Sequence, residues 1–188
     1  MKMIHISTPL ENARTLRAGQ EVAISGVIYT ARDAAHQRLV GLIAEGKPLP
    51  FDPEGAIIYY VGPTPPKPGD AVGSAGPTTS MRMDSLTVPL LQQGVKGMIG
   101  KGGRATTVIE AMKEHGAVYF AAIGGAAALI AQSIKEVEVV AYPDLGAEAV
   151  HRMVVENFPA IVAIDSLGNN VYEQGVAKYR NTGLEEAE

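Results

Sequence analysis

The sequence has 188 residues, 46% of them hydrophobic and 19% charged, which is enough to form one domain with its own core. The formal net charge of −4 argues against nucleic-acid binding, because nucleic-acid-binding surfaces are usually basic. The chain has no cysteine, which excludes disulfides, thiol nucleophiles and thiolate ligands. Its four histidines are scattered, so we expect no metal site built from this chain alone.

Two further patterns concern localisation. From the sequence we expect no membrane span. The N-terminal residues contain no apolar core of the kind found in signal peptides. Together these patterns predict a cytoplasmic protein.

The first third of the chain alternates between strand-like and helix-like segments. VAISGVIYT at 22–30 is rich in β-branched residues and predicts a strand. Apolar residues at helical spacing predict a helix at 31–45, which Gly46 ends. The continuous apolar run AIIYYV at 56–61 predicts a strand buried on both faces, and PTPPKPGD after it predicts a rigid turn.

The rest of the chain continues this alternation. A helix at 81–92 is expected to be shortened or kinked by Pro89. The following segments predict, in order, a strand at 95–99, a helix at 104–115 ended by Gly116, strands at 117–123 and 137–142, a helix at 147–157 and a strand at 160–164. SLGNN then predicts a turn that leads NVYEQ back as a closing hairpin.

This order of elements predicts an α/β fold. We expect one domain over residues 1–180, with a mixed sheet flanked by helices, followed by a polar tail at 181–188. The first thirty residues and the proline-rich turn are expected to form a second, smaller sheet.

Candidate functional residues gather in four segments near strand-to-helix turns, which in α/β folds often share one edge of the sheet, where ligands bind. These segments are YTARDAAH (29–36), GPTTSMRMD (76–84), IGKGGR (99–104) and IGGAAA (123–128). Three of them carry a cation: Arg32, Arg82 and Lys101. Three cations near helix N-termini predict a site for a small polycarboxylate.

Some of these polar residues also have structural interpretations. Thr30 and Asp33 have the spacing of a capping box, in which Asp33 would only cap a helix. Thr78, Thr79 or Ser80 could likewise be a helix N-cap.

The charged residues have similar alternatives. Arg32 and Arg82 could pair with surface carboxylates, and His36 could be a solvated histidine or one at the edge of the core. Lys101 is harder to explain structurally. Glycines on both sides let the backbone approach a ligand closely, and no structural role requires lysine there.

Two nucleotide-binding patterns fail in detail. A P-loop requires Ser or Thr after the lysine, whereas Gly102 follows Lys101. GGAAA lacks the G-x-G-x-x-G of a dinucleotide-binding turn. The sequence therefore favours a small organic anion over a nucleotide.

The segments ARDAAHQRL, GPTTSMRMD, MIGKGG, AIGGAAAL and PAIVAIDSLGNNVYE follow one another in this order. Together they resemble the C-terminal domain of class I fumarases, and the beta subunit of two-chain fumarases and L(+)-tartrate dehydratases. The resemblance covers the chain from about residue 5 to residue 180. GPTT-x-x-RMD is its most specific element.

This resemblance implies a swivelling β/β/α domain of a hydro-lyase. It implies a four-iron–four-sulfur cluster held by three cysteines of a partner domain or alpha subunit, with an open iron that binds substrate, and no cofactor bound by this chain. It places Arg32, Thr78, Arg82 and Lys101 in the substrate pocket, with Thr78 and Lys101 as catalytic candidates.

Three functions stay open at this point. The first is reversible hydration of fumarate to L-malate by a two-subunit enzyme, and the second is dehydration of L(+)-tartrate. The third is a non-catalytic module that binds a small anion or a nucleotide. The role of Thr78 is also open: it removes the proton, or it only hydrogen-bonds a substrate carboxylate while a partner residue takes the proton.

Overall fold

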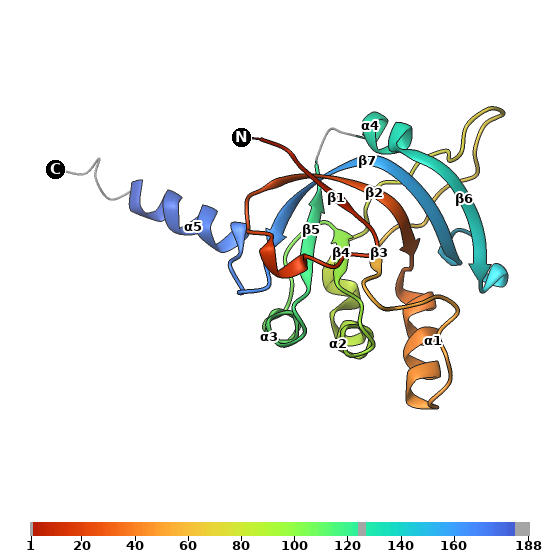
Figure 1. Ribbon diagram of the computed structural model, residues 1–188, viewed down its shortest axis with the longest axis horizontal. Helices are drawn as coiled ribbons and strands as arrows, with labels where there is room; N and C mark the ends of the chain where they lie inside the picture. The colour runs from red at the N-terminus through yellow and green to blue at the C-terminus, as the bar shows by residue number, and fades with distance from the viewer. Residues whose placement is uncertain (1, 124–126, 183–188) are drawn as a thin grey trace.

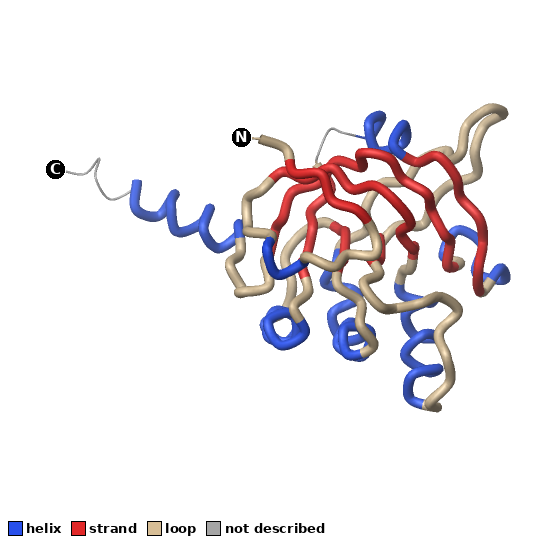
Figure 2. The backbone as a smooth tube through the Cα atoms, in the orientation of Figure 1, coloured by secondary structure: helices blue, strands red, loops and turns tan. Residues whose placement is uncertain are grey.

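The computed structural model describes residues 2–123 and 127–182 of the chain (Figure 1). Its seven strands form a single sheet of order β1-β2-β3-β4-β5-β7-β6, in which β2 also pairs with β7. The strands are β1 (Ile4–Ser7), β2 (Glu21–Thr30), β3 (Ile57–Tyr59), β4 (Gly97–Gly100), β5 (Val118–Ala122), β6 (Ile134–Ala141) and β7 (Val150–Ile164). The extra pairing closes β2, β3, β4, β5 and β7 into a five-stranded barrel, which Figure 2 shows as a strongly curved sheet.

The direction of the strands divides the sheet in two. Strands β1 to β5 run parallel to their neighbours, while β7 runs antiparallel to β2, β5 and β6. The sheet is therefore mixed, as predicted. The second, smaller sheet that we expected is wrong for the described residues: β1 joins the main sheet, and the proline-rich turn contributes no strand.

Five α-helices and three short 3-10 helices complete the described fold. They are α1 (Asp33–Ala44), α2 (Asp84–Gln92), α3 (Thr106–His115), α4 (Ala127–Ser133) and α5 (Val171–Thr182), with η1 (Ala13–Thr15), η2 (Ser80–Met83) and η3 (Pro143–Glu148). Figure 1 shows α1, α2 and α3 below the sheet, α4 on the opposite side and α5 projecting from the body. No helix among the described residues is both long enough and apolar enough to cross a membrane.

The apolar residues form two cores, one on each face of the sheet. Ile57 and Tyr59 of β3 join the core that β2, β5 and β7 also line. Ile58 of β3 and the following Tyr60 join the core between the sheet and helices α1, α2 and α3. Successive strand residues point to opposite faces, so a strand buried on both faces must be apolar throughout. All six residues of AIIYYV are buried, as predicted, but the strand itself covers only Ile57–Tyr59.

The helix predicted at 147–157 is wrong, because this stretch begins with the end of η3 and continues into β7. The pairing of β7 with β2 shifts register opposite Ile24 and Gly26, and Asn157 has a φ of 54° there. A β-bulge of this kind interrupts the alternation of side chains between faces. The apolar residues of HRMVVENF consequently fall at a spacing that imitates a helix.

The closing hairpin predicted after SLGNN is also wrong, because NVYEQ begins α5. The turn itself forms around Asp165, whose carboxylate accepts hydrogen bonds from the backbone N–H groups of Leu167 and Asn169, at 3.0 and 3.1 Å. Asn170 then accepts a hydrogen bond from the N–H of Tyr172 at 3.0 Å. This contact satisfies an N–H of the first helical turn, so the chain leaves the turn as a helix rather than a strand.

Candidate active site

The carboxyl ends of β2, β3 and β4 meet at one edge of the barrel, because these strands are parallel neighbours. Arg32 lies just beyond β2 as the N-cap of α1, and Lys101 directly follows β4. The fourth predicted segment follows β5, but its residues 124–126 lie outside the described part of the chain. The cation-bearing segments 29–36, 76–84 and 99–104 meet at this edge, which we call the rim.

The segment 76–84 is held on the rim by backbone contacts. The N–H of Thr78 donates to the carbonyl of Tyr60 at 2.7 Å, and the N–H of Ser80 donates to the carbonyl of Lys101 at 2.9 Å. Thr79 and Lys101 also form an isolated parallel β-bridge. The backbones that carry Thr78 and Lys101 are therefore direct neighbours, although the two residues are far apart in the sequence.

A chain of hydroxyl groups lies beneath this contact. The hydroxyl of Ser80 is 2.8 Å from that of Tyr119, and the Tyr119 hydroxyl donates to the carbonyl of Gly102 at 2.8 Å. Both side chains are buried. They fix the loop after β4 to the segment 76–84. Thr79 occupies the N-cap position of η2, as one of the predicted alternatives, but its side chain makes no capping hydrogen bond, and the N-cap of α2 is Met83.

Gly100 leaves the space in which Ser80 sits. A Cβ atom at position 100 would lie 1.9 Å from the Ser80 Oγ, whereas one at Gly103 would meet no described atom within 4 Å. We expect Gly100→Ala to lower the free energy of unfolding by about 1–3 kcal/mol through overpacking, and Gly103→Ala to change it much less. Chemical denaturation of the two variants measures the difference, and equal stabilities would contradict this packing.

Arg82 ties η2 to the start of α1. Its Nε donates to the Asp33 carboxylate at 3.0 Å, and the Arg82 side chain is 53% exposed. The predicted capping box is therefore wrong. Asp33 binds Arg82, and the Thr30 hydroxyl instead accepts from the N–H of His151 at 3.1 Å. The pairing predicted as an alternative for Arg82 does occur, but it uses only Nε, and no described residue forms an ion pair or hydrogen bond with the two terminal nitrogens.

Arg32 is more buried than Arg82. Its Nε lies 3.5 Å from the Glu148 carboxylate, yet that nitrogen has no hydrogen-bond partner among the described residues. The side chain packs against Gly62, where a Cβ atom would come within 3.3 Å of the guanidinium. The absence of a side chain at Gly62 thus leaves room for Arg32 at the end of β3.

Thr78 and Lys101 keep their functional groups available. Lys101 is exposed, and its ammonium group forms no ion pair with any residue in the described ranges. Thr78 is half-buried, and its hydroxyl makes no side-chain hydrogen bond within the same part of the chain. An unpaired ammonium group and a hydroxyl without a partner are each suited to bind an anionic ligand.

His36 is fully buried, not solvated or at the edge of the core. Burial lowers the pKa of His36 from 6.5 to about 4, and the hydrogen bond to the Arg32 carbonyl opposes this effect. That bond joins Nδ1 to the carbonyl oxygen at 2.8 Å. The neutral ring therefore donates through Nδ1 and supports the backbone of Arg32 from inside the core.

Asp84 and Arg104 are two further residues of the site that were not predicted from the sequence. The structure joins them in a buried ion pair, with Arg104 Nε 2.7 Å from Asp84 Oδ1. Asp84 ends GPTTSMRMD and Arg104 ends IGKGGR. Because both segments are predicted at one edge of the sheet, these opposite charges could have indicated the ion pair.

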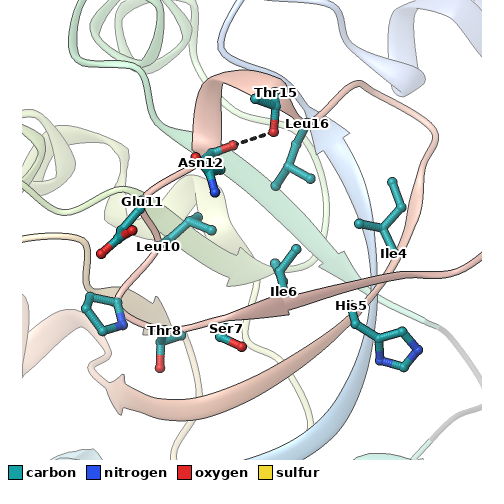
Figure 3. A pocket seen from close by; sticks show the side chains of 11 residues that line it. Ile4, His5, Ile6, Ser7, Thr8, Leu10, Glu11, Asn12, Thr15 and Leu16 are labelled. Atoms are coloured by element: carbon teal, nitrogen blue, oxygen red, sulfur yellow. Dashed lines mark hydrogen bonds between the residues drawn. The ribbon is translucent and has the colours of Figure 1, made fainter.

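A cavity lies elsewhere, beside the N-terminal segment (Figure 3). It has a volume of about 550 Å³ and lies beside the edge strand β1, lined by residues 4–12, 15 and 16. His5 and Glu11 are its only ionisable lining residues. It therefore offers no cluster of cations for a diacid, and the rim remains the better candidate site.

The donor groups of this chain do not fit an iron–sulfur cluster. The sequence contains no cysteine, and the described residues contain no group of three His, Cys, Asp or Glu side chains that could hold a metal ion. Such a cluster requires thiolate ligands in most known sites.

The family model described as Fumarase C-terminus matches residues 1–175. The chain belongs to this family. The match extends over both the rim segments and the strands of the barrel, so the fumarase C-terminus fold includes the candidate site.

Curated relatives of this fumarase C-terminus domain fall into two groups. The anaerobic class I fumarate hydratase of Escherichia coli is 46% identical over 160 residues, which are 84% of this chain and 29% of the relative. Fumarate hydratase 2 of Leishmania major is 43% identical over 162 residues, 85% of this chain and 28% of the relative. This chain thus spans less than a third of these two relatives.

The second group is represented by a relative of similar length. The protein named "Putative L(+)-tartrate dehydratase subunit beta" from Methanocaldococcus jannaschii is 41% identical over 170 residues, 87% of each chain. The same domain therefore occurs both as a part of longer proteins and as a chain of about this size.

Proposed function

We propose that this chain is the beta subunit, or the corresponding domain, of an iron–sulfur-dependent hydro-lyase that reversibly hydrates fumarate to L-malate. The observation that carries this proposal is the backbone pairing of the Thr78 segment with Lys101 at the edge where Arg32 and Arg82 also arise. The names of the relatives, fumarate hydratase among them, support the reaction class.

The cations of the rim suit a four-carbon diacid. Malate and fumarate are dianions near neutral pH, and an arginine fork can bind a carboxylate through two parallel hydrogen bonds. Arg82 uses Nε for Asp33, so its terminal nitrogens remain for a ligand. Arg32 and Lys101 provide the further positive charge that the second carboxylate requires.

Loss of water from malate breaks a C–H bond next to one carboxylate and the C–O bond of the hydroxyl on the neighbouring carbon. The hydroxyl would leave as hydroxide, with Lewis-acid assistance that the partner's cluster would supply. As the C–H bond breaks, negative charge develops on that carboxylate, and a fixed cation directed at it lowers the barrier. We assign this stabilisation to Lys101 and the proton removal to Thr78. A threonine hydroxyl ionises only in a strongly positive field, which Lys101 and Arg82 would supply. The alternative role of Thr78 is a hydrogen bond to a substrate carboxylate.

We propose that a partner subunit or domain with cysteine ligands carries the four-iron–four-sulfur cluster, because the donor groups of this chain do not fit one. This domain would close over the partner as a swivelling unit, with the rim facing the partner's site. The proposal involves no nucleic acid and no membrane, and it places the assembly in the cytoplasm.

L(+)-tartrate is the second candidate substrate. The relative named as a tartrate dehydratase beta subunit matches this chain over 87% of its own length, which favours this alternative. Tartrate differs from malate by one hydroxyl group, and both offer two carboxylates to the same cations. The described residues therefore fit either diacid.

The experiment is to purify the chain with a cysteine-bearing partner under anaerobic conditions and to assay malate, fumarate and tartrate. We expect hydro-lyase activity on one diacid from the assembled pair, and a colourless, iron-free and inactive chain when it is purified alone. Activity from the isolated chain would contradict an active site to which the partner contributes the cluster. Absence of any partner and any activity would favour a non-catalytic anion-binding module.

A further inference from the structure

A buried ion pair lies beneath the rim, between the segment 76–84 and the loop after β4. The Asp84 side chain is 10% exposed and that of Arg104 is fully buried. Arg104 donates through Nε to Asp84 Oδ1 at 2.7 Å and through Nη2 to the Thr87 hydroxyl at 2.9 Å. The other Asp84 oxygen accepts from the N–H of Ala105 at 2.7 Å. Asp84 thus binds both the side chain of Arg104 and the backbone beside it.

The guanidinium of Arg104 also lies over the rings of two tyrosines. Its Cζ atom is 5.2 Å from the ring centre of Tyr60 and 5.1 Å from that of Tyr119. Tyr60 accepts the backbone hydrogen bond of Thr78, and Tyr119 donates to the carbonyl of Gly102. Arg104 therefore contacts the residues that hold the two halves of the rim in place.

We propose that Asp84 and Arg104 are positioning residues that fix Lys101 relative to Thr78. This inference rests on the proposed function, because Thr78 and Lys101 need a fixed arrangement only if both act on the same substrate. The fully buried side chain of Arg104 cannot touch a substrate, so its effect must pass through the loop 100–105.

The free energy of burying charges explains why this ion pair is better suited to positioning than to stabilising the fold. Removing two charges from water has a large cost, and a buried ion pair is often no more stabilising than apolar residues of the same volume. Its hydrogen-bond geometry, however, admits only one arrangement of the groups that it joins. A displacement of about 1 Å at a reacting group can lower the rate by about a hundred-fold, so a rigid connection is useful here.

The test compares Arg104→Lys, Arg104→Gln and Asp84→Asn in the full chain assembled with its partner. We expect kcat to fall by about ten- to a hundred-fold with a smaller change in KM, because substrate still meets the same cations in a less defined arrangement. Arg104→Lys keeps the charge but not the planar fork, so its loss should be smaller than that of Arg104→Gln. Lys113→Gln, which removes a cation from an exposed pair on α3, is the matched control.

A second measurement distinguishes positioning from general stability. Hydrogen exchange of the peptide containing residues 100–105 should become at least about ten-fold faster in Arg104→Gln, while peptides from β2 and β7 keep their protection. If Arg104→Gln does not fold, the same comparison applies to Arg104→Lys and Asp84→Asn. Unchanged kcat and unchanged exchange in the folded variants would overturn the inference, even if their melting temperatures fall.

The measurement also separates this inference from the proposed function. If the unsubstituted assembly acts on none of the three diacids, the proposed function fails and only the exchange of residues 100–105 decides the inference. Faster exchange confined to that loop supports the positioning role, and unchanged exchange overturns it.

Discussion

Thr78→Ala is expected to lower kcat of the assembled enzyme by about 100- to 10,000-fold, the range typical for loss of a general base. The Thr78 backbone is fixed by the carbonyl of Tyr60, and its hydroxyl is free of other partners among the described residues. Removing the hydroxyl should therefore leave the fold of the rim intact. The measurement is steady-state turnover of malate with the variant and its partner.

The neighbouring threonine provides a matched control. Thr79 is exposed and joins Lys101 only through its backbone bridge, so Thr79→Ala should keep kcat within a few-fold of the unsubstituted enzyme. Thr78→Ser, which keeps a hydroxyl, should restore most of the turnover. Near-normal kcat with a raised KM in Thr78→Ala would show that Thr78 only binds a carboxylate and that another residue takes the proton.

The parallel half of the fold could be predicted from the sequence because its signals are local. A β-branched or fully apolar run, a turn and a helical spacing recur in order, as in 22–30 followed by 31–45. Parallel neighbours then place the carboxyl ends of the strands together, which brings Arg32 and Lys101 to one edge. The antiparallel half was harder, because the bulge at Asn157 gives β7 a helical pattern of apolar residues.

The support beneath the rim could not be predicted in the same way. The pairing of Asp84 with Arg104 and the burial of His36 depend on which side chains meet across α1, α2 and the loop after β4. Spacing along one segment carries no information about such contacts. The sequence motifs singled out Arg32, Arg82 and Lys101 as candidates, but not the buried charges beneath their backbone.

His36 makes the stability of the fold depend on pH. Because burial lowers its pKa from 6.5 to about 4, the folded protein binds the proton more weakly than the unfolded chain does. Stability is therefore fully present above pH 6.5 and is lost as the pH falls toward 4. The shift corresponds to about 3 kcal/mol of unfolding free energy over this range. Urea denaturation at a series of pH values measures the loss.

His36→Asn isolates this contribution. Asparagine can keep a donor near the Arg32 carbonyl, but it does not titrate, so the variant should lose about 3 kcal/mol less than the unsubstituted protein between pH 6.5 and pH 4. A smaller slope should remain, because burial also lowers the pKa of His151. The comparison uses the change with pH within each protein, since the smaller side chain lowers stability at every pH. Equal losses in both proteins would mean that His36 takes up its proton without unfolding, and that the core beneath Arg32 admits water.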